Sequence, residues 1–424
     1  MTIPGKKSSN AAMPLPKSTR SMAPIDAQIG IIFSGVEFGD DRTHVTMERE
    51  LRELLAEDRP LKVYAGFDPT SVDLHLGHTL PMRKLRQFQE LGHKITFLVG
   101  NFTGLVGDPS DKNKARPMLT PERLAENART YADQAFRILD GERTAIKYNA
   151  DWLSKLTFTD VVNLCSKFTV AQFLERDNFS KRWENHDAVY LSEFMYAIMQ
   201  AYDAVALETD VQIGGSDQLF NLMAGRTLQR DAGQRPQVVV TLPILVGTDG
   251  HERMSKSTGN SIGINDAPND MYGKVMSIPD SATLDFFTLV TRLSPSEVGD
   301  VRDAIEGGSL TSMGAKKRLA KEIVAAFYNA DQSTESQTYF EATIQRQETP
   351  DKMREFPIDE AQPLNRVLTE SALVASGGEV RRLVKQGAVS VNEERISDFT
   401  REVKPGDEIR VGRHKFLRLT ASNE

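Results

Sequence analysis

The sequence has only one cysteine, Cys165, and no apolar run long enough to cross a membrane. A single cysteine excludes an internal disulfide and any cysteine-rich zinc module, and it is typical of proteins from reducing compartments. A membrane-spanning helix needs roughly 18 or more consecutive apolar residues, so an integral membrane protein is excluded as well. We therefore expect a cytoplasmic protein with no membrane partner.

The chain also lacks a strong excess of charge of either sign. Its 424 residues carry a formal net charge of −7, with 39% hydrophobic and 26% charged residues, which is ordinary for a globular protein. The charge is uneven, because residues 363–424 hold eleven Lys and Arg against nine Asp and Glu. A slightly basic end on an acidic body is compatible with an RNA-contacting appendage, but composition alone leaves the function open.

Apolar segments of strand and helix length alternate in the first part of the chain. The expected strands are residues 61–66, 94–99, 145–148, 211–213 and 238–242, and the expected helices include one from Gly77, one over 120–139 and one over 191–205. This alternation predicts an α/β fold with a mostly parallel sheet covered by helices on both faces. In such sheets, ligands bind where strand ends meet helix starts.

The rhythm changes after about residue 267, where helices are expected without strands, and the last sixty residues show a compact α+β pattern. The predicted parts are a disordered extension (1–40), a Rossmann-like parallel-sheet domain (41–265), a helical domain (266–345), a linker (346–362) and a small α+β domain (363–424). The basic start of the chain leaves organelle targeting open, although its prolines argue against the amphipathic helix of a transit peptide.

The first motif with chemical content is Gly66-Phe67-Asp68-Pro69-Thr70, followed by His75-Leu76-Gly77-His78. It begins where a strand ends and closes where a helix begins. Free N–H groups at a helix N-terminus favour anions, and imidazoles can donate hydrogen bonds to phosphate oxygens that gain charge in a transition state. The motif predicts a polyphosphate site. The alternatives are two ordinary loop histidines or a zinc pair, and HxxH without other soft ligands is a poor zinc site, so we predict no protein-bound metal.

A second motif, residues 253–260 (Arg-Met-Ser-Lys-Ser-Thr-Gly-Asn), concentrates cations and hydroxyls in a loop beyond the last strand. Mobile cations can close on a pyrophosphate leaving group and compensate its charge. Taken alone, such a run is usually a solvated surface loop. The combination of HxGH early in a parallel sheet with [KR]MSKS after its last strand is far more specific, and it resembles the paired motifs of class I aminoacyl-tRNA synthetases.

Two further segments suggest the amino acid. On the helix over 191–205, Tyr196, Gln200 and Asp203 share the face opposite the apolar residues. Such a stripe is often only solvated, but Tyr, Gln and Asp without Lys or Arg suit a small polar ligand. In the segment 212–218, glycines permit close approach of the backbone, and Asp217 is placed to accept hydrogen bonds from ribose hydroxyls.

Five segments together resemble the bacterial-type tyrosyl-tRNA synthetase family, namely residues 64–78, 103–110, 193–203, 212–221 and 253–257. The resemblance implies a homodimer that uses tyrosine, ATP and tRNA(Tyr), with Mg²⁺ carried by ATP and no DNA partner. It also implies two steps, namely ATP-dependent adenylation of tyrosine and transfer to the 3′ end of the tRNA.

The same resemblance implies roles for individual residues. The phenol hydroxyl of the substrate would meet Tyr64 and Asp203. Its ammonium group would meet Asp108, Tyr196 and Gln200, and its carboxylate would lie near Gln218. The residues implied at ATP are Gly66, Asp68, Thr70, His75, Gly77, His78, Gly215 and Asp217, with Lys112, Arg116, Arg253, Lys256 and Ser257 as the pyrophosphate clamp.

The sequence departs from the family pattern at three positions. Gln218-Leu219 lacks the tryptophan that many members carry after the glutamine, Ala65 replaces a frequent cysteine, and Arg253 replaces the usual lysine. None of these changes removes a contacting charge, although the planar guanidinium of Arg253 is not equivalent to an ammonium group.

The segment 379–392 resembles an S4-type RNA-binding domain. Three basic residues, Arg381, Arg382 and Lys385, lie within about one helical turn. They could bind phosphates, or they could form an ordinary solvated basic face.

Three alternative functions remain for the whole chain: a tryptophanyl relative, a small-molecule adenylyltransferase, and an inactive RNA-binding paralogue. A carboxylic acid beside a tyrosine suits a phenol better than an indole, which argues against the tryptophanyl relative. An inactive paralogue should have lost one of four residues, His75, His78, Lys256 or Asp203, and all four are present.

Overall fold

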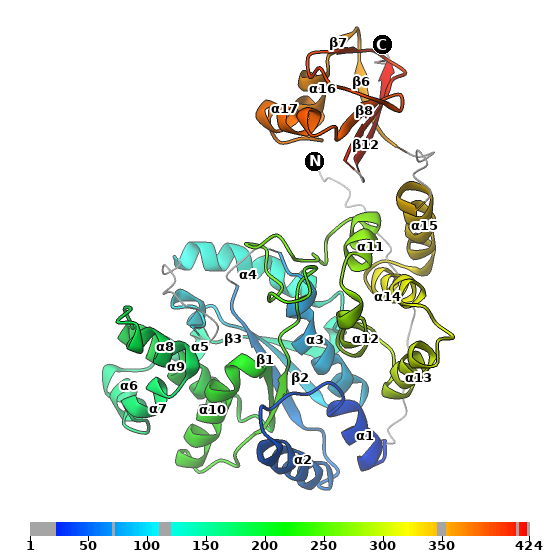
Figure 1. Ribbon diagram of the computed structural model, residues 1–424. Helices are drawn as coiled ribbons and strands as arrows, with labels where there is room; N and C mark the ends of the chain where they lie inside the picture. The colour runs from blue at the N-terminus through cyan, green and yellow to red at the C-terminus, as the bar shows by residue number, and fades with distance from the viewer. Residues whose placement is uncertain (1–22, 70–72, 110–119, 346–352, 413–414, 422–424) are drawn as a thin grey trace, which may run out of the picture. The chain divides into compact units, whose positions relative to one another are not determined.

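The computed structural model describes residues 23–69, 73–109, 120–345, 353–412 and 415–421. By its internal contacts the chain divides into two compact units. The first comprises Met1–Asn265 with Leu284–Asp303, and the second comprises Asp266–Thr283 with Ala304–Glu424. Figure 1 shows the elements of both units in chain order.

A five-stranded parallel sheet lies at the centre of the first unit (Figure 1). Its strands are β1 (Lys62–Phe67), β2 (Lys94–Val99), β3 (Thr144–Tyr148), β4 (Val211–Gly215) and β5 (Val238–Leu242), in the order β3-β2-β1-β4-β5. All four strand pairs are parallel, which confirms the predicted fold class. The strand order changes direction between β1 and β4, and ligands of open α/β sheets bind beside such a switch point.

Helices accompany this sheet, some packed on it and others, over residues 158–184, set apart from it (Figure 1). They are α1 (Ile25–Ile32), α2 (Asp41–Leu55), α3 (Leu76–Glu90), α4 (Pro121–Ala135), α5 (Ala150–Leu153), α6 (Phe158–Cys165), α7 (Val170–Leu174), α8 (Asp177–Glu184), α9 (Leu191–Leu207), α10 (Leu219–Asp231) and α12 (Thr283–Val290). Thr120 caps α4 by accepting a hydrogen bond from the backbone N–H of Arg123, as its position before a proline predicts. The helix ends at Ala135, four residues before the predicted end.

Helix α1 corrects the prediction that residues 1–40 form a disordered extension. Ile29 and Ile32 are buried, and the Lys84 ammonium donates to the backbone oxygens of Ile32 and Ser34, at 2.8 and 3.0 Å. Ile29 and Ile32 have helical spacing, but the Pro- and Lys-rich composition of the preceding twenty residues led to the prediction of disorder. Residues 1–22 lie outside the described part of the chain.

The second unit begins with helices and carries no strand before residue 354 among its described residues. Its helices are α11 (Pro268–Met276), α14 (Ser312–Phe327) and α15 (Ala330–Phe340), while α13 (Pro295–Glu306) runs across the boundary between the units. The ring of Tyr272 in α11 packs on Phe340 at the end of α15, with centroids 5.5 Å apart. No helix in the described ranges is long and apolar enough to span a membrane.

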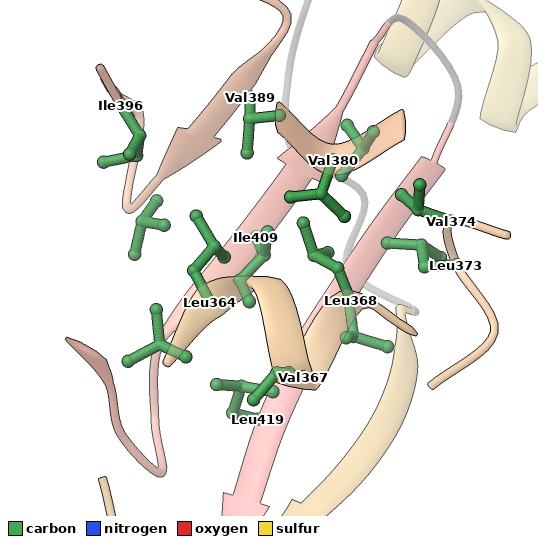
Figure 2. Close-up of a cluster of buried hydrophobic side chains, with 14 of the residues drawn as sticks. Leu364, Val367, Leu368, Leu373, Val374, Val380, Val389, Ile396, Ile409 and Leu419 are labelled. Atoms are coloured by element: carbon green, nitrogen blue, oxygen red, sulfur yellow. The ribbon is translucent and has the colours of Figure 1, made fainter. Parts of the chain in front are cut away.

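The end of the chain folds around its own apolar core (Figure 2). Its elements are β6 (Arg354–Ile358), β7 (Gln362–Pro363), α16 (Leu364–Glu370), α17 (Gly377–Lys385), β8 (Val389–Val391), β9 (Glu394–Arg395), β10 (Glu402–Val403), β11 (Glu408–Val411) and β12 (Lys415–Ala421). Five of the strands form a sheet in the order β6-β12-β11-β8-β9. Val367 and Leu368 of α16 and Val380 of α17 pack against its buried face.

Strand β6 corrects the predicted linker over 346–362, because Arg354–Ile358 pairs in parallel with β12. Pro357 and the neighbouring polar residues favoured a linker in the sequence, yet the strand lies at the edge of its sheet, where proline is tolerated. The compact terminal fold therefore begins before residue 363.

Candidate active site

Three segments meet at the carboxyl ends of β1 and β4, where the strand order changes direction. Asp68 follows β1, Gly215 ends β4, and Asp217 lies in the short turn before α10. His75 is the N-cap residue of α3. The fold thus brings together motifs that are more than 130 residues apart in the sequence.

A buried carboxyl group and a buried phenol face one another at one end of this site, which we call the phenol end. Asp203 of α9 is 3% exposed and Tyr64 of β1 is 1% exposed. The indole N–H of Trp152 donates to Asp203 Oδ1 at 2.8 Å, and Asn149 Nδ2 donates to Oδ2 at 3.3 Å. Burial raises the pKa of Asp203 to about 8, although both hydrogen bonds oppose that rise.

The Tyr64 hydroxyl is buried and has no hydrogen-bond partner among the described residues. Burial, and then the negative charge of Asp203, raise the pKa of Tyr64 well above its usual value, so the hydroxyl stays protonated. A buried polar group without a partner costs free energy. A ligand hydroxyl placed between Tyr64 and Asp203 would satisfy both groups.

Asn149 and Trp152 are functional candidates that the sequence analysis missed. Both follow β3, whose carboxyl end opens onto the same edge of the sheet as β1. Their position after a parallel strand was the available signal. Nothing in the local pattern indicated that they would reach across to a helix fifty residues later.

A second set of hydrogen bonds is centred on Asp68, which directly follows β1. The Tyr196 hydroxyl donates to Asp68 Oδ2 at 2.9 Å, and Thr103 donates to Asp68 Oδ1 at 2.7 Å. Gly100 permits this approach, because a Cβ atom there would lie 2.0 Å from Asp68 Oδ1. Asp68, which the family resemblance assigned to ATP, therefore contacts Tyr196, which the same resemblance assigned to the amino acid.

Three amides and a carboxylate form two further hydrogen-bonded pairs. Gln218 Nε2 donates to Asp108 Oδ2 at 2.7 Å, and Gln218 Oε1 accepts from the backbone N–H of Gly215 at 3.2 Å. Gln200 Oε1 accepts from Asn221 Nδ2 at 3.0 Å. The predicted ammonium and carboxylate ligands Asp108 and Gln218 are thus in direct contact.

Arg176 is a buried cation that the sequence analysis did not identify. Its guanidinium lies over the rings of Phe220 and Phe179, at 4.9 and 5.1 Å from their centroids. Burial lowers the pKa of Arg176, and the negative charges of Asp108 and Asp217 oppose that change. The amino-acid side of the site therefore contains a positive charge as well as several carboxylates.

His75 and His78 pack against each other at the start of α3, in what we call the phosphate end. Their ring centroids are 3.8 Å apart, and the His75 backbone N–H donates to His78 Nδ1 at 3.3 Å. Burial, and then the charges of Arg253 and Lys256, lower the pKa of His75 to about 4. Burial and the neighbouring His75 hold the pKa of His78 well below its usual value. Both imidazoles are neutral at pH 7, and Gly77 lies between them in the first turn.

The loop of residues 253–257 reaches the same end. Arg253 Nη1 lies 3.2 Å from Asp217 Oδ2, and Lys256 Nζ lies 2.9 Å from Asp73 Oδ2. The Ser257 hydroxyl is 2.9 Å from that of Ser255. Of the predicted clamp residues, Arg253, Lys256 and Ser257 therefore lie together in this loop, and both cations contact carboxylates.

Chain pairing explains why the loop lies there. The backbone N–H of Leu76 donates to Ile262 O at 2.9 Å, and the N–H of Ile264 donates to Leu74 O at 3.1 Å. The residues just beyond the loop are thereby paired with those that precede α3.

Some predicted residues lie elsewhere. Thr70, Lys112 and Arg116 lie outside the described residues. Arg381, Arg382 and Lys385 lie on α17 in the second unit. Gly66 lies within β1. Within the described ranges, no group of three or more His, Cys, Asp or Glu side chains could hold a metal ion.

Comparison with known proteins gives two family matches that together cover most of the chain. Residues 56–345 match the model of class I tRNA synthetases (W and Y), and residues 345–418 match the model of the tyrosine–tRNA ligase C-terminal domain. The tyrosine–tRNA ligase of Moorella thermoacetica is 45% identical over 376 residues, which are 88% of this chain and 91% of that protein. That of Thermotoga maritima is 44% identical over 375 residues, 88% and 94% of the two chains.

Solved structures show the same fold. The tyrosyl-tRNA synthetase of Archaeoglobus fulgidus, solved with L-tyrosine, has a TM-score of 0.58 at 22% identity and covers 74% of this chain and 99% of that one. A C-terminally truncated mitochondrial tyrosyl-tRNA synthetase from Aspergillus nidulans has a TM-score of 0.57 at 23% identity, with 76% and 92% covered.

Proposed function

Because the chain belongs to the tyrosine–tRNA ligase family, we propose that it activates L-tyrosine with ATP and then transfers the tyrosyl group to the 3′ end of tRNA(Tyr). The observation that carries the choice of amino acid is the phenol end of the site. There, the hydrogen-bonded Asp203 lies beside the Tyr64 hydroxyl, to which no described residue is hydrogen-bonded. A tyrosine phenol would donate to Asp203 and accept from Tyr64.

This arrangement explains discrimination against phenylalanine. Phenylalanine would leave both buried groups without a partner, and sites built to bond a hydroxyl reject the analogue that lacks it far more strongly than an apolar pocket rejects an extra methylene. The established example of this effect is tyrosyl-tRNA synthetase itself, which rejects phenylalanine by a factor of about 10⁵. An indole offers a donor but no hydroxyl oxygen to accept from Tyr64, so tryptophan is disfavoured too.

The polar residues beyond the ring would hold the amino-acid head group. Asp108, Tyr196 and Gln200 would bind the ammonium group, and Gln218 would lie near the carboxylate. The contact of Gln218 with Asp108 supports this, because it places an amide donor directly beside the proposed ammonium ligand. The ends of one zwitterion would thus meet adjacent side chains.

The phosphate end would hold ATP. Asp217 and Gly215 would take the ribose, and Gly66, Asp68, Gly77, His75 and His78 would line the nucleotide path. Neutral imidazoles donate one hydrogen bond each without carrying a charge, so the positive charge would come from the clamp cations, Arg253 and Lys256 among them, and from the Mg²⁺ that accompanies ATP. Thr70, Lys112, Arg116 and Ser257 complete the proposed set.

In the first step a tyrosine carboxylate oxygen attacks the α-phosphorus of ATP, and the bond from that phosphorus to the pyrophosphate oxygen breaks. No covalent bond to the enzyme is needed, so the protein contributes positioning and stabilisation of the leaving charge. Arg253 and Lys256 carry that second role. In the second step a ribose hydroxyl at the 3′ end of the tRNA attacks the activated carbonyl and releases AMP.

The terminal domain would contact the tRNA through α17. Arg381 lies over the ring of Phe399 at 4.6 Å, and Arg382 lies 3.8 Å from Glu379. With Lys385 these form an exposed basic face. Phosphate contacts of this kind position an RNA without reading its sequence.

A second copy of the chain is the proposed partner of an exposed apolar area on α6 to α9. Large apolar side chains are exposed here at positions where a monomer would place polar ones: Phe158, Val162, Val170, Trp183, Tyr190 and Leu191. Exposed apolar area of this kind marks an interaction surface. The homodimer that the family implies would cover it.

The test is amino-acid-dependent exchange between ATP and labelled pyrophosphate. We expect exchange with tyrosine, and at equal concentration almost none with tryptophan or phenylalanine. Equal exchange with phenylalanine would remove Tyr64 and Asp203 from their proposed roles. Exchange without any charging of tRNA(Tyr) would contradict the second step.

A further inference from the structure

One buried carboxamide lies at the centre of the loop that carries the clamp cations. Asn260 is 5% exposed. Its Oδ1 accepts from the Ser255 backbone N–H and from the Thr258 hydroxyl, both at 2.8 Å. Its Nδ2 donates to Asp249 Oδ2 at 2.6 Å and to the Arg253 backbone oxygen at 3.1 Å. One side chain thereby connects four positions of the loop.

The surrounding chain is shaped to admit this side chain. A Cβ atom on Gly247 would lie 2.2 Å from Asn260 Nδ2, so only glycine leaves room there. The backbone N–H of Thr248 donates to Asn260 O at 2.9 Å. Asp249 Oδ1 accepts from the N–H groups of His251 and Glu252, which orients its other oxygen toward Asn260.

Backbone pairing anchors the start of the loop as well, since Val246 and Arg253 form an antiparallel bridge and the Gly247 N–H donates to Glu252 O at 2.8 Å. Met254 is buried and its N–H donates to Leu245 O at 2.9 Å, whereas the side chains of Arg253 and Lys256, on either side of it, are 47% and 42% exposed. Each cation is nearly half exposed, so its ion pair with Asp217 or Asp73 contributes little free energy. On either side of Lys256 the loop is held by Asn260, through the Ser255 N–H and the Thr258 hydroxyl.

We propose that Asn260 is a positioning residue for adenylation, which fixes the backbone of residues 253–258 so that Arg253 and Lys256 meet the pyrophosphate leaving group. This inference rests on the proposed function. Asn260 contacts neither substrate. It acts by lowering the number of loop conformations that must be sampled before the charges align, and such alignment is a large component of catalysis.

The test compares Asn260→Ala with the wild-type full-length protein. The adenylation rate constant at saturating tyrosine and ATP should fall by roughly tenfold to a hundredfold, the scale of a misplaced catalytic group. The dissociation constant of tyrosine should stay within about twofold, because the phenol end does not contact the loop.

A double variant separates positioning from a general loss of structure. If Asn260 acts through the clamp, the penalty of Asn260→Ala combined with Lys256→Ala should be clearly smaller than the product of the two single penalties, because loss of Lys256 leaves only Arg253 for Asn260 to position. Gln229→Ala is the matched control. Gln229 is also a fully buried amide bonded to backbone groups, at Ala204 O, Thr209 O and Gln237 N, but it lies outside the loop, so its effect should multiply with that of Lys256→Ala.

Asp249→Asn tests the same idea in a nearly isosteric variant, should Asn260→Ala fail to fold. An amide at 249 can still accept from His251 and Glu252, but it presents an N–H to the N–H of Asn260. We expect a severalfold slower adenylation with unchanged tyrosine affinity. A wild-type rate in these variants, or a penalty that multiplies with Lys256→Ala, would overturn the inference alone. Absence of tyrosine-dependent exchange in the wild-type protein would overturn the proposed function itself.

Discussion

At the phenol end of the site, Asp203 and Tyr64 are almost wholly buried, whereas at the phosphate end the clamp cations Arg253 and Lys256 remain nearly half exposed. The carboxyl group of Asp203 is held by two donors from the start of α5, which follows β3. The cations, by contrast, form ion pairs with Asp217, which is 18% exposed, and with Asp73, which is 54% exposed. In the proposed function, selection of the amino acid would thus rely on desolvated groups fixed before binding, while charge compensation would rely on groups that can change partner.

This difference follows from what each end must do. A buried group gains its discriminating power from the cost of leaving it without a partner, so the phenol end must exclude water. A leaving pyrophosphate moves and gains charge during the reaction, and solvated cations on a loop can follow it. The predictions below test this contrast.

The largest expected effect is at the phenol end. Asp203→Asn replaces one acceptor oxygen with an N–H, which must face Trp152, Asn149 or the substrate hydroxyl. We expect tyrosine affinity to fall by about a hundredfold, as for loss of a hydrogen bond to a charged group, and preference over phenylalanine to collapse. Equilibrium binding of both amino acids measures this. Unchanged discrimination would show that the buried carboxyl does not select the substrate.

At the phosphate end, Lys256→Ala should slow adenylation by about a hundredfold, the cost of removing one group that stabilises developing charge. Tyrosine affinity should stay within about twofold. Stopped-flow measurement of adenylate formation separates the two quantities. An unchanged rate would rule out the clamp, and a large loss of tyrosine affinity would break the contrast between the two ends.

A pH series sharpens the contrast further. The free protein holds Asp203 largely protonated at pH 7, since its pKa is about 8, while a phenol donor favours the ionised form. Binding therefore lowers that pKa, so tyrosine affinity should rise between pH 6 and 8, by at most about tenfold per unit, and level off above 8. Trp152→Phe removes a bond that lowers the pKa of Asp203 and should move the plateau to higher pH. Lys256→Ala should leave the profile unchanged, and a flat profile in the wild-type protein would contradict the assignment of Asp203.

The smallest effect is expected from Asp73→Asn, which removes the carboxylate beside Lys256. An exposed ion pair contributes between zero and about 1 kcal/mol, and here it competes with ATP for the ammonium group. The KM for ATP should therefore fall, by less than about fivefold, and the difference should shrink at high salt. A rise in KM would show that Asp73 helps to bind ATP.

Much of the fold was predictable from the sequence because local signals agreed with the tertiary structure. The strands β2 and β5 and the Thr120–Pro121 helix start all lie where periodicity and capping placed them. Helix α1 and strand β6 were missed for one reason, namely that short apolar segments are stabilised by distant partners. Those partners are Lys84 for α1 and β12 for β6, and neither is visible in a local window.

The candidate site divides in the same way. Helical spacing predicts that Tyr196, Gln200 and Asp203 share one face, and all three are buried, which excludes the alternative of a solvated stripe. Trp152 and Asn149 were not predictable, since their importance comes from a contact with Asp203 that only the folded chain creates. The depressed pKa values of His75 and His78 also depend on burial, which the motif does not specify.

The most direct test is a crystal structure of the protein with L-tyrosine and a non-hydrolysable ATP analogue. The account predicts the phenol oxygen within hydrogen-bond distance, about 2.7 Å, of both Asp203 and the Tyr64 hydroxyl, with the triphosphate at the N-terminus of α3. An aromatic ring bound with its hydroxyl in solvent, or a triphosphate away from His75 and His78, would contradict it.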